Sequence, residues 1–285
     1  MLPHLNSKQV LGQDLRAPLT STVETGSRPT GNTAKLQAQA EVRHMLLEAA
    51  GPVRILDVGC VGARGQFDFW APLLDDPRCS AHLRLCGVDV QTVDNARRYA
   101  QDRGWNNIEL HTGSAYELAN LFSPCSFDMV VSTQVMEHLK HRRRFLENAY
   151  AVLKEGGTAY FTLDAGHFHR GRPHGLAALR SLVTMTYAHL RGTAERYYDH
   201  AVFDSDIETL YAQTGFTVQD KRFYCLSPLK EIHNQKLGRG AQDAFLRHWK
   251  ELEDLLNTQA DFIASNKHYF MALYYKLRRG PGQVA

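Results

Sequence analysis

The sequence predicts an α/β fold in which helices cover both faces of a mostly parallel sheet. Three observations support this fold class: the chain has 285 residues, 44% of them are hydrophobic, and short apolar runs alternate with helical patterns. A chain of this length suits one large α/β domain with insertions. Its hydrophobic content is enough to fill the core of such a domain.

The candidate strands are short apolar runs rich in branched residues. They are 53–59 (VRILDVG), 83–90 (LRLCGVDV), 127–133 (FDMVVST) and 157–163 (GTAYFTL). Helical patterns precede the first run and separate the others, at 34–50, 66–74, 92–103 and 138–153. Strands that alternate with helices form βαβ units, whose strands lie parallel.

The rest of the chain departs from this alternation. Residues 1–33 are rich in Ser, Thr, Pro and Gly and are expected to form an N-terminal arm, and residues 34–285 one domain. Within that domain we predict cap insertions at 164–203 and 228–264. The remaining elements expected are helices at 175–191, 204–214 and 240–264, and strands at 216–225 and 267–277.

Charge and cysteine usage exclude several classes of protein. A net charge of +3 is too balanced to indicate nucleic-acid binding, and the basic run 140–144 is expected to be a solvated helix face. Five scattered cysteines without a CxxC pair indicate free thiols rather than disulfides or zinc. We see no secretory signal and no apolar stretch long enough to span a membrane, so we expect a cytoplasmic protein.

A glycine-rich turn follows the first apolar run. Asp57 and Gly59 lead into Cys60, Val61 and Gly62, with another glycine three residues later. Glycines allow a ligand to approach the backbone closely, and the N–H groups at a following helix start can bind an anionic group. The alternatives for this turn are a nicotinamide dinucleotide site and an ordinary tight turn.

An acidic residue ends the second apolar run. Asp89 lies where a carboxylate can accept hydrogen bonds from both hydroxyls of a ribose. Sites for NAD and for S-adenosylmethionine (SAM) share this acid. The alternative for Asp89 is a helix N-cap.

The motifs downstream are more specific. The segment 113–139 (GSAYELANLFSPCSFDMVVSTQVMEHL) is followed by a helix and then by LKEGGTAYFTLD. Together with the glycine turn and Asp89, this ordered set resembles the SAM-dependent methyltransferases of the UbiE-like, methyltransferase 11 type, across about residues 52–163. The resemblance implies a Rossmann-like, mostly parallel sheet of seven strands with helices on both faces, an antiparallel last strand, and SAM as the cofactor.

Carried over position by position, the resemblance implies a cofactor site with a defined set of residues. Asp89 is expected at the ribose, Val90 beside the adenine, and Gln134 near the sulfonium. The full set is Asp57, Gly59, Cys60, Val61, Gly62, Asp89, Val90, Ser114, Ala115 and Gln134. Two positions depart from the family pattern: Val61 replaces its second glycine, and Ser114 replaces the acid after the third strand.

Methyl transfer to oxygen or nitrogen can require a general base, and histidine suits this role at neutral pH. The candidate catalytic residues are His138, from the Glu-His-Leu motif, and His167 and His169, from the first insertion. The alternatives are a structural helix-start residue for His138 and exposed loop residues for the other two. We predict no metal site, because no acidic residue near His167 and His169 completes a ligand set.

The sequence therefore predicts a SAM-dependent methyltransferase that acts on oxygen, nitrogen or carbon of a small-molecule acceptor. The variant glycine loop is loosely associated with natural-product and polysaccharide pathways. Three alternatives stay open: a SAM-binding protein without catalysis, an NAD-dependent oxidoreductase, and RNA binding through 140–144. A homodimer is expected, with the segment 228–264 as its surface.

Overall fold

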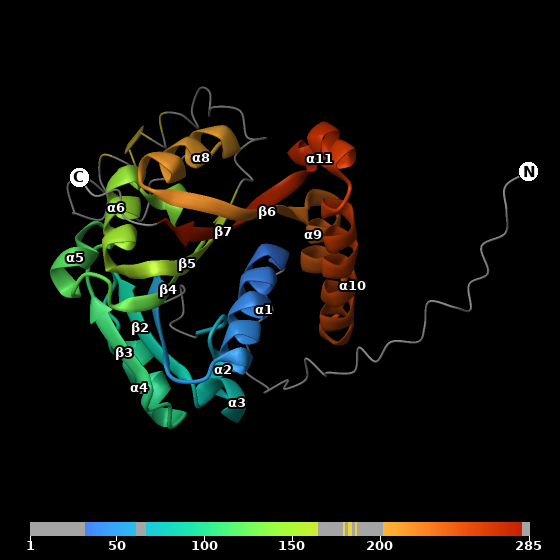
Figure 1. The fold of residues 1–285 in the computed structure, drawn as a ribbon. Coiled ribbons are helices and arrows are strands. Elements are labelled where there is room, and N and C mark those ends of the chain that lie inside the picture. The colour runs from blue at the N-terminus through green and yellow to red at the C-terminus, as the bar shows by residue number, and fades with distance from the viewer. Residues whose placement is uncertain are drawn as a thin grey trace, which may run out of the picture.

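The structure is a computed structural model, and it describes residues 32–60, 67–164, 179, 182, 183, 186 and 202–280. Within these residues lies a seven-stranded sheet with the strand order β3-β2-β1-β4-β5-β7-β6 (Figure 1). Its strands are β1 (Val53–Val58), β2 (Leu83–Asp89), β3 (Ile108–Thr112), β4 (Phe127–Thr133), β5 (Leu153–Asp164), β6 (Phe216–Leu226) and β7 (Phe270–Arg279).

The first five strands are parallel to one another, and β7 is antiparallel to both of its neighbours, β5 and β6. The predicted fold class is confirmed. Parallel strands place all their carboxyl ends at one edge of the sheet, and ligands of open α/β sheets bind at that edge.

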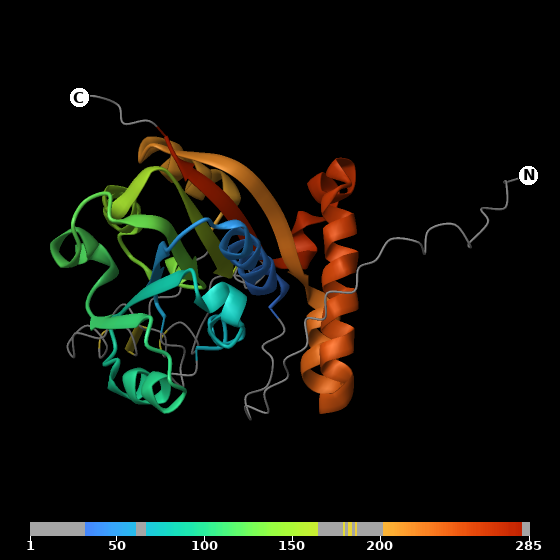
Figure 2. The same ribbon diagram turned by 60° about the horizontal axis from the view of Figure 1, so that its bottom comes forward.

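Helices cover both faces of the sheet. One face carries α1 (Thr33–Glu48), α2 (Ala71–Leu74), α3 (Pro77–Ser80) and α4 (Asp94–Asp102), and the other carries α5 (Leu118–Leu121), α6 (Arg142–Val152) and α8 (Asp204–Gln213). Between β6 and β7 lie α9 (Ser227–Glu231), the π-helix η5 (Ile232–Lys236), α10 (Arg239–Asn257) and α11 (Ala260–Asn266). Figures 1 and 2 both show α10 beside α1.

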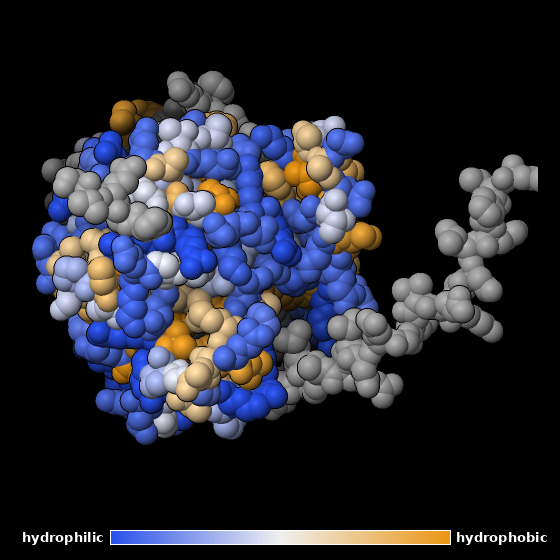
Figure 3. Space-filling view, in the orientation of Figure 1, coloured by the Kyte–Doolittle hydropathy of each residue, from blue (hydrophilic) through white to orange (hydrophobic). Residues whose placement is uncertain are grey.

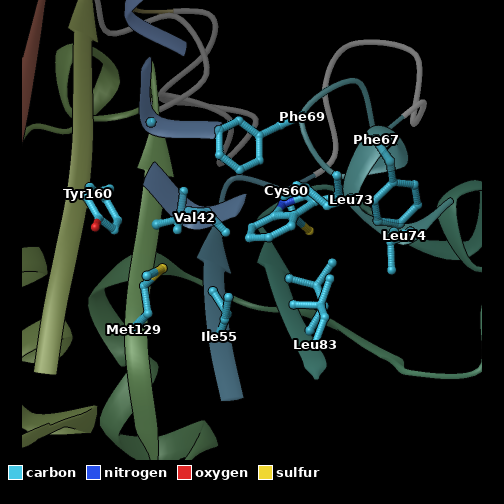
Figure 4. Close-up of a cluster of buried hydrophobic side chains, with 14 of the residues drawn as sticks. Val42, Ile55, Cys60, Phe67, Phe69, Leu73, Leu74, Leu83, Met129 and Tyr160 are labelled. Atoms are coloured by element: carbon cyan, nitrogen blue, oxygen red, sulfur yellow. The ribbon is translucent and has the colours of Figure 1, made fainter. Parts of the chain in front are cut away.

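The core on the α1 side explains why the central strands are apolar throughout. Val42 of α1 meets Ile55 of β1 and Met129 of β4, and none of the three side chains is exposed (Figure 4). The next residue of β1, Leu56, is equally buried in the cluster on the opposite face. A strand buried on both faces has no polar alternation, which is the pattern of VRILDVG.

Several elements differ from the sequence-based boundaries. Only the last turn of the helix expected at 66–74 is helical, as α2, and α6 begins at Arg142 rather than at 138. The strand expected at 157–163 extends back to Leu153, where the register of β4 and β5 shifts at Phe127 and Met129. The single helical region expected at 240–264 is divided into α10 and α11. The helix expected at 175–191 lies almost entirely outside the described residues.

A buried carboxylate joins the start of α1 to the end of β6 and to α10. Glu253 of α10 is fully buried and accepts hydrogen bonds from the Thr33 hydroxyl, from the Leu226 backbone N–H at 2.5 Å and from Trp249 Nε1 at 2.7 Å. Thr33 in turn accepts from the backbone N–H of Cys225 at 3.1 Å. The start of α1, the end of β6 and α10 are therefore held as one unit. No described helix is long and apolar enough to cross a membrane.

Candidate active site at the carboxyl edge of the sheet

The turn after β1 can hold only glycine at its first position. Gly59 has a φ of +85°, and a Cβ added there would lie 2.4 Å from Cγ2 of Val135, which follows β4. The Gly59 N–H donates to the Val88 carbonyl of β2 at 2.7 Å. The ends of β1, β2 and β4 therefore meet at a glycine, which has no side chain.

Asp57 lies beside this turn, at the end of β1, and is 5% exposed. Trp70 Nε1 donates a hydrogen bond to its Oδ2 at 2.5 Å. Burial raises the pKa of Asp57 to about 7, while the Trp70 bond and the charge of Lys35 act in the opposite direction. A cationic group that binds next to Asp57 would stabilise the charged form of its carboxyl group.

Lys35 is a residue of this site that the sequence analysis missed. It belongs to the first turn of α1, whose N-cap Asn32 accepts from the Lys35 backbone N–H at 3.0 Å. Burial lowers the pKa of Lys35, and the nearby carboxylates of Asp68 and Asp57 raise it. The only sequence signal was a lysine in the first turn of an N-terminal helix, and the packing of α1 brings that lysine to the end of β1.

Asp89 ends β2 and is 7% exposed. Its Oδ1 accepts from the backbone N–H of Gln91 at 2.8 Å. The N-cap of α4 is Val93, so Asp89 is not a helix cap, and that alternative is wrong. The neighbouring Val90 has 56% of its surface exposed, which leaves an apolar side chain open next to a buried acid.

Ser114 and Ala115 follow β3 at the same edge and are both half-buried. Ser114 Oγ accepts from the backbone N–H of Tyr116 at 3.2 Å and caps the 3-10 turn η1 (Ala115–Glu117). The hydroxyl therefore already has a local hydrogen bond that an acid at this position would also make.

Cys60 is buried and packs against the strand beside it. A Cβ on Gly87 of β2 would lie 2.6 Å from the Cys60 Sγ, so the thiol fills the space that this glycine leaves. Burial raises the pKa of Cys60, which keeps the sulfur a neutral packing group. The predicted positions Val61 and Gly62 lie outside the described residues.

Gln134 lies at the end of β4 in a left-handed conformation, with a φ of +57°. Such a backbone is uncommon for a residue other than glycine and is found at functional sites. Its N–H donates to the Thr162 carbonyl of β5 at 2.8 Å. The strained turn directs the chain from β4 into the 3-10 turn η2 (Met136–His138).

The turn η2 contains the Glu-His pair of the sequence motif. Glu137 is 1% exposed, and its Oε1 accepts from the backbone N–H of Asp164 at the end of β5, at 3.2 Å. His138 is half-buried, with its backbone N–H bonded to the Val135 carbonyl at 2.9 Å. The structure therefore places His138 at the same edge as Asp57 and Asp89. His167 and His169 lie outside the described residues.

Among the described residues, one group has the spacing of metal ligands: Cys86 of β2 with Glu109 and His111 of β3, whose ligand atoms lie within 4.8 Å of one another. Its residues lie on two neighbouring strands, so no spacing along the sequence indicates this group. Its closest contact is the ion pair between His111 and Glu109, at 2.9 Å.

Comparison with known proteins agrees with this geometry. Residues 56–159 match the family model described as "Methyltransferase domain". The mitochondrial ubiquinone biosynthesis O-methyltransferase of Mus musculus is 29% identical over 115 residues, or 39% of this chain. The ubiquinone biosynthesis O-methyltransferase of a Chelativorans strain is 26% identical over 190 residues, or 64% of this chain. The aligned region spans 28% of the mouse protein and 66% of the Chelativorans protein.

Solved structures share the fold. A SAM-dependent methyltransferase from Mesorhizobium loti has a TM-score of 0.52 at 18% identity, covering 86% of this chain and 98% of the other. The geranyl diphosphate C-methyltransferase of Streptomyces coelicolor has a TM-score of 0.52 at 15% identity, covering 86% and 79%. The [4+2]-cyclase SpnF has a TM-score of 0.53 at 17% identity, covering 86% and 81%. Residues 56–159 are therefore similar to a methyltransferase domain, and together with the shared fold this supports a class I methyltransferase whose cofactor is SAM.

Proposed function

We propose that this protein transfers the methyl group of SAM to oxygen, nitrogen or carbon of a small-molecule acceptor. The observation that carries the proposal is the meeting of a tight glycine turn with two buried acids at the carboxyl edge of the sheet. Gly59, Asp57 and Asp89 all lie inside the segment that matches the methyltransferase domain. The finer assignment to the UbiE-like type is part of the same proposal.

Each polar part of SAM has a matching group at this edge. The Asp89 carboxylate suits the ribose hydroxyls, and the exposed Val90 suits a face of the adenine. Ser114 and Ala115 would lie at the adenine edge. Asp57 would hold the ammonium of the methionine part, and Lys35 its carboxylate, because the two side chains bring opposite charges to the end of β1.

SAM supplies an activated methyl group, so the main tasks of the protein are to position the acceptor and to exclude water from it. In transfer to oxygen, a lone pair of the acceptor forms the new bond to the methyl carbon while the carbon–sulfur bond breaks and its electrons stay on sulfur. The acceptor proton passes to His138, which is half-buried beside the strained Gln134 turn. His167 and His169 stay candidates for the same role.

The direct test has two stages. Calorimetry of the full chain with S-adenosylhomocysteine is expected to show binding, and incubation of methyl-labelled SAM with metabolite extracts of the source cell is expected to yield a labelled small molecule. Phenolic and alcoholic acceptors are the first class to examine, because the relatives carry the name O-methyltransferase. Absence of S-adenosylhomocysteine binding would refute the proposal.

A SAM-binding protein without catalysis is the second candidate. The observation that favours it is Ser114, whose side chain caps a local turn where the family has an acid. The variant His138→Gln separates the two functions for an oxygen acceptor. It should lower kcat and leave S-adenosylhomocysteine affinity unchanged if His138 takes the proton. A protein that binds the ligand but labels no acceptor would support the second candidate.

The cytoplasmic location and the homodimer also remain proposals. Support for a dimer surface comes from apolar side chains left exposed on α10 and α11, among them Leu252, Leu255 and Phe262. The space-filling view shows apolar residues around these helices (Figure 3). Light scattering of the purified chain, compared with Leu255→Ser, tests whether this surface joins two copies.

A further inference from the structure

Three side chains that carry metal-binding atoms lie together on the outer pair of strands. They are Cys86 of β2 and Glu109 and His111 of β3, the edge strand beside β2 (Figure 1). The Glu109 carboxylate is the centre of this group. Its Oε1 lies 2.9 Å from His111 Nε2, and its Oε2 accepts from the Cys86 thiol, with 3.9 Å between the oxygen and Sγ. All three ligand atoms lie within 4.8 Å of one another.

The strand register explains why these residues share one face of the sheet. Cys86 and Glu109 are direct partners in the parallel ladder between β2 and β3. His111 lies two residues after Glu109, so both side chains leave β3 on the same face. The three side chains therefore converge from strands, which hold ligands more precisely than loops do.

The group is apolar on one side and open to solvent on the other. Cys86 is 2% exposed, and the His111 ring lies edge-on to Phe122, with 5.2 Å between the ring centres. The side chains of Glu109 and His111 are 61% and 31% exposed. Cys86 and Glu109 also belong to the lining of a hollow of about 470 Å³. An ion from solvent can therefore reach the group.

The spacing fits a zinc ion after small movements of the side-chain ends. Zinc bonds of about 2.0–2.3 Å in tetrahedral geometry place neighbouring ligand atoms about 3.4–3.6 Å apart. The observed distance between Glu109 Oε1 and His111 Nε2 is shorter, at 2.9 Å, and that between Glu109 Oε2 and Cys86 Sγ is longer, at 3.9 Å. Rotation of the exposed Glu109 and His111 side chains can bring all three atoms to the tetrahedral spacing.

The types of ligand indicate zinc rather than a hard cation. Mg²⁺ and Ca²⁺ prefer oxygen ligands, whereas a thiolate and an imidazole suit Zn²⁺. The thiolate of Cys86 and the carboxylate of Glu109 would together balance the two charges of Zn²⁺. The filled site is then neutral, although the charge of Arg54 is close enough to act on Cys86.

We propose that Cys86, Glu109 and His111 bind a zinc ion, with water as the fourth ligand. When the ion binds, Cys86 Sγ releases its proton to solvent and bonds to zinc as a thiolate, and His111 binds through neutral Nε2. The ion would tie the edge strand β3 to β2, the strands that lead to Ser114 and Asp89. The inference goes beyond the proposed function and does not depend on it.

Calorimetry with zinc chloride, on the full chain freed of metal by a chelator, tests the proposal. The wild type should bind one zinc ion and release a proton. His111→Gln should weaken zinc binding by about 100-fold, because loss of a ligand costs at least as much as loss of a group that only orients one. The matched control is His248→Gln, which removes the histidine of another exposed pair, 3.0 Å from Glu251. The control should bind zinc like the wild type.

Cobalt tests the sulfur ligand separately. A cobalt–thiolate bond gives intense near-ultraviolet absorption that carboxylate and imidazole ligands do not give. The wild type with Co²⁺ should show this absorption, Cys86→Ser should lose it, and Cys125→Ser, which removes an exposed thiol, should keep it. Zinc should also raise the melting temperature of the wild type more than that of His111→Gln, because the ion stabilises the folded state that binds it. That comparison holds even if Cys86→Ser does not fold.

Three results would overturn the proposal. The first is no zinc binding by the wild type. The second is equal zinc affinity of the wild type and His111→Gln, which would leave a surface ion pair beside a thiol that only packs. The third is cobalt binding without thiolate absorption in the wild type. S-adenosylhomocysteine binding, measured in the same samples, reports separately on the proposed function.

Discussion

Two buried carboxylates in this protein have the same pKa but different surroundings. Burial raises the pKa of Asp57, at the end of β1, and of Glu253, in α10, to about 7 in each case. Glu253 accepts hydrogen bonds from Thr33, Leu226 and Trp249, which belong to three separate elements. Asp57 accepts from Trp70 and faces the charge of Lys35.

The difference separates a structural acid, Glu253, from the proposed binding acid, Asp57. The donors around Glu253 come from within the fold, and each of them would be left buried without an acceptor if the carboxylate were removed. The carboxylate of Asp57 lies beside the tight Gly59 turn, which packs against Val135, and in the proposed function a ligand supplies it with a further donor. A raised pKa alone therefore does not identify a functional residue, because structural acids show it as well.

The largest expected effect comes from removing the structural acid. Glu253→Ala should lower the free energy of unfolding by about 4 kcal/mol, because several buried donors lose their acceptor and a cavity remains. Urea denaturation measures the change. The affinity for S-adenosylhomocysteine of the protein that stays folded should equal that of the wild type, and a large loss of affinity would show that the two regions are coupled.

The variant Glu253→Gln tests the same role of Glu253 through the pH dependence of the free energy of unfolding. The pKa of Glu253 is raised in the folded state, so the stability it contributes is present below about pH 4.5 and is lost as pH rises through about 7. The wild type should therefore become less stable from about pH 5 to pH 8, and the glutamine variant should show a smaller decrease over that range. An unchanged pH profile in the variant would argue against a buried Glu253.

The next effect concerns the backbone beside Asp57. Gly59→Ala should weaken S-adenosylhomocysteine binding by about 3 kcal/mol, because the added methyl group meets Val135 and distorts the turn. Gly104→Ala is a matched control, since Gly104 also has a positive φ, of +70°, but has open space around its Cβ position. The control isolates the cost of the backbone conformation. Equal losses of S-adenosylhomocysteine affinity in the two variants would show that Gly59 is not part of the binding site.

A smaller effect is expected at Asp89, the proposed ribose ligand. Asp89→Asn keeps the size of the side chain but loses the charge, so affinity for S-adenosylhomocysteine should fall by about 2 kcal/mol. Calorimetry gives the affinity, and thermal denaturation should show little change in the absence of ligand. Asp94→Asn, at an exposed position of α4, is the matched control and should bind normally. Normal binding by Asp89→Asn would contradict the ribose contact.

The sequence was sufficient to place a candidate site residue wherever that residue ends or directly follows an apolar run. Asp89 ends β2 and Gln134 directly follows β4, and the edge of a parallel sheet brings them to one side without further information. The apolar pattern predicted no boundaries for β3, because only the central one of its five residues is buried. The predicted starts of α6 and β5 differ from the observed ones. The reason is that a 3-10 turn and a register shift leave no hydrophobic pattern in the sequence.

Residues contributed by distant segments could not be predicted in this way. Lys35 reaches Asp57 only through the packing of α1 on the sheet. The partners of Glu253 are as far apart in the sequence as Thr33 and Trp249, and no local pattern connects them. Local periodicity specifies an element and its buried face, whereas the contacts between elements depend on how those faces meet.

The smallest effect is the pH dependence of binding at Asp57. A cationic ammonium prefers the charged carboxylate, so S-adenosylhomocysteine should bind more weakly below about pH 7, where Asp57 is protonated, and affinity should rise with pH by up to about 1 kcal/mol. Asp57→Asn should flatten this rise without abolishing binding, because Asp89 and the Gly59 turn remain. Calorimetry in buffers of different ionisation enthalpy also counts the proton released when the ligand binds. If the wild type binds S-adenosylhomocysteine equally well below and above about pH 7 and releases no proton, Asp57 has a structural role, like Glu253.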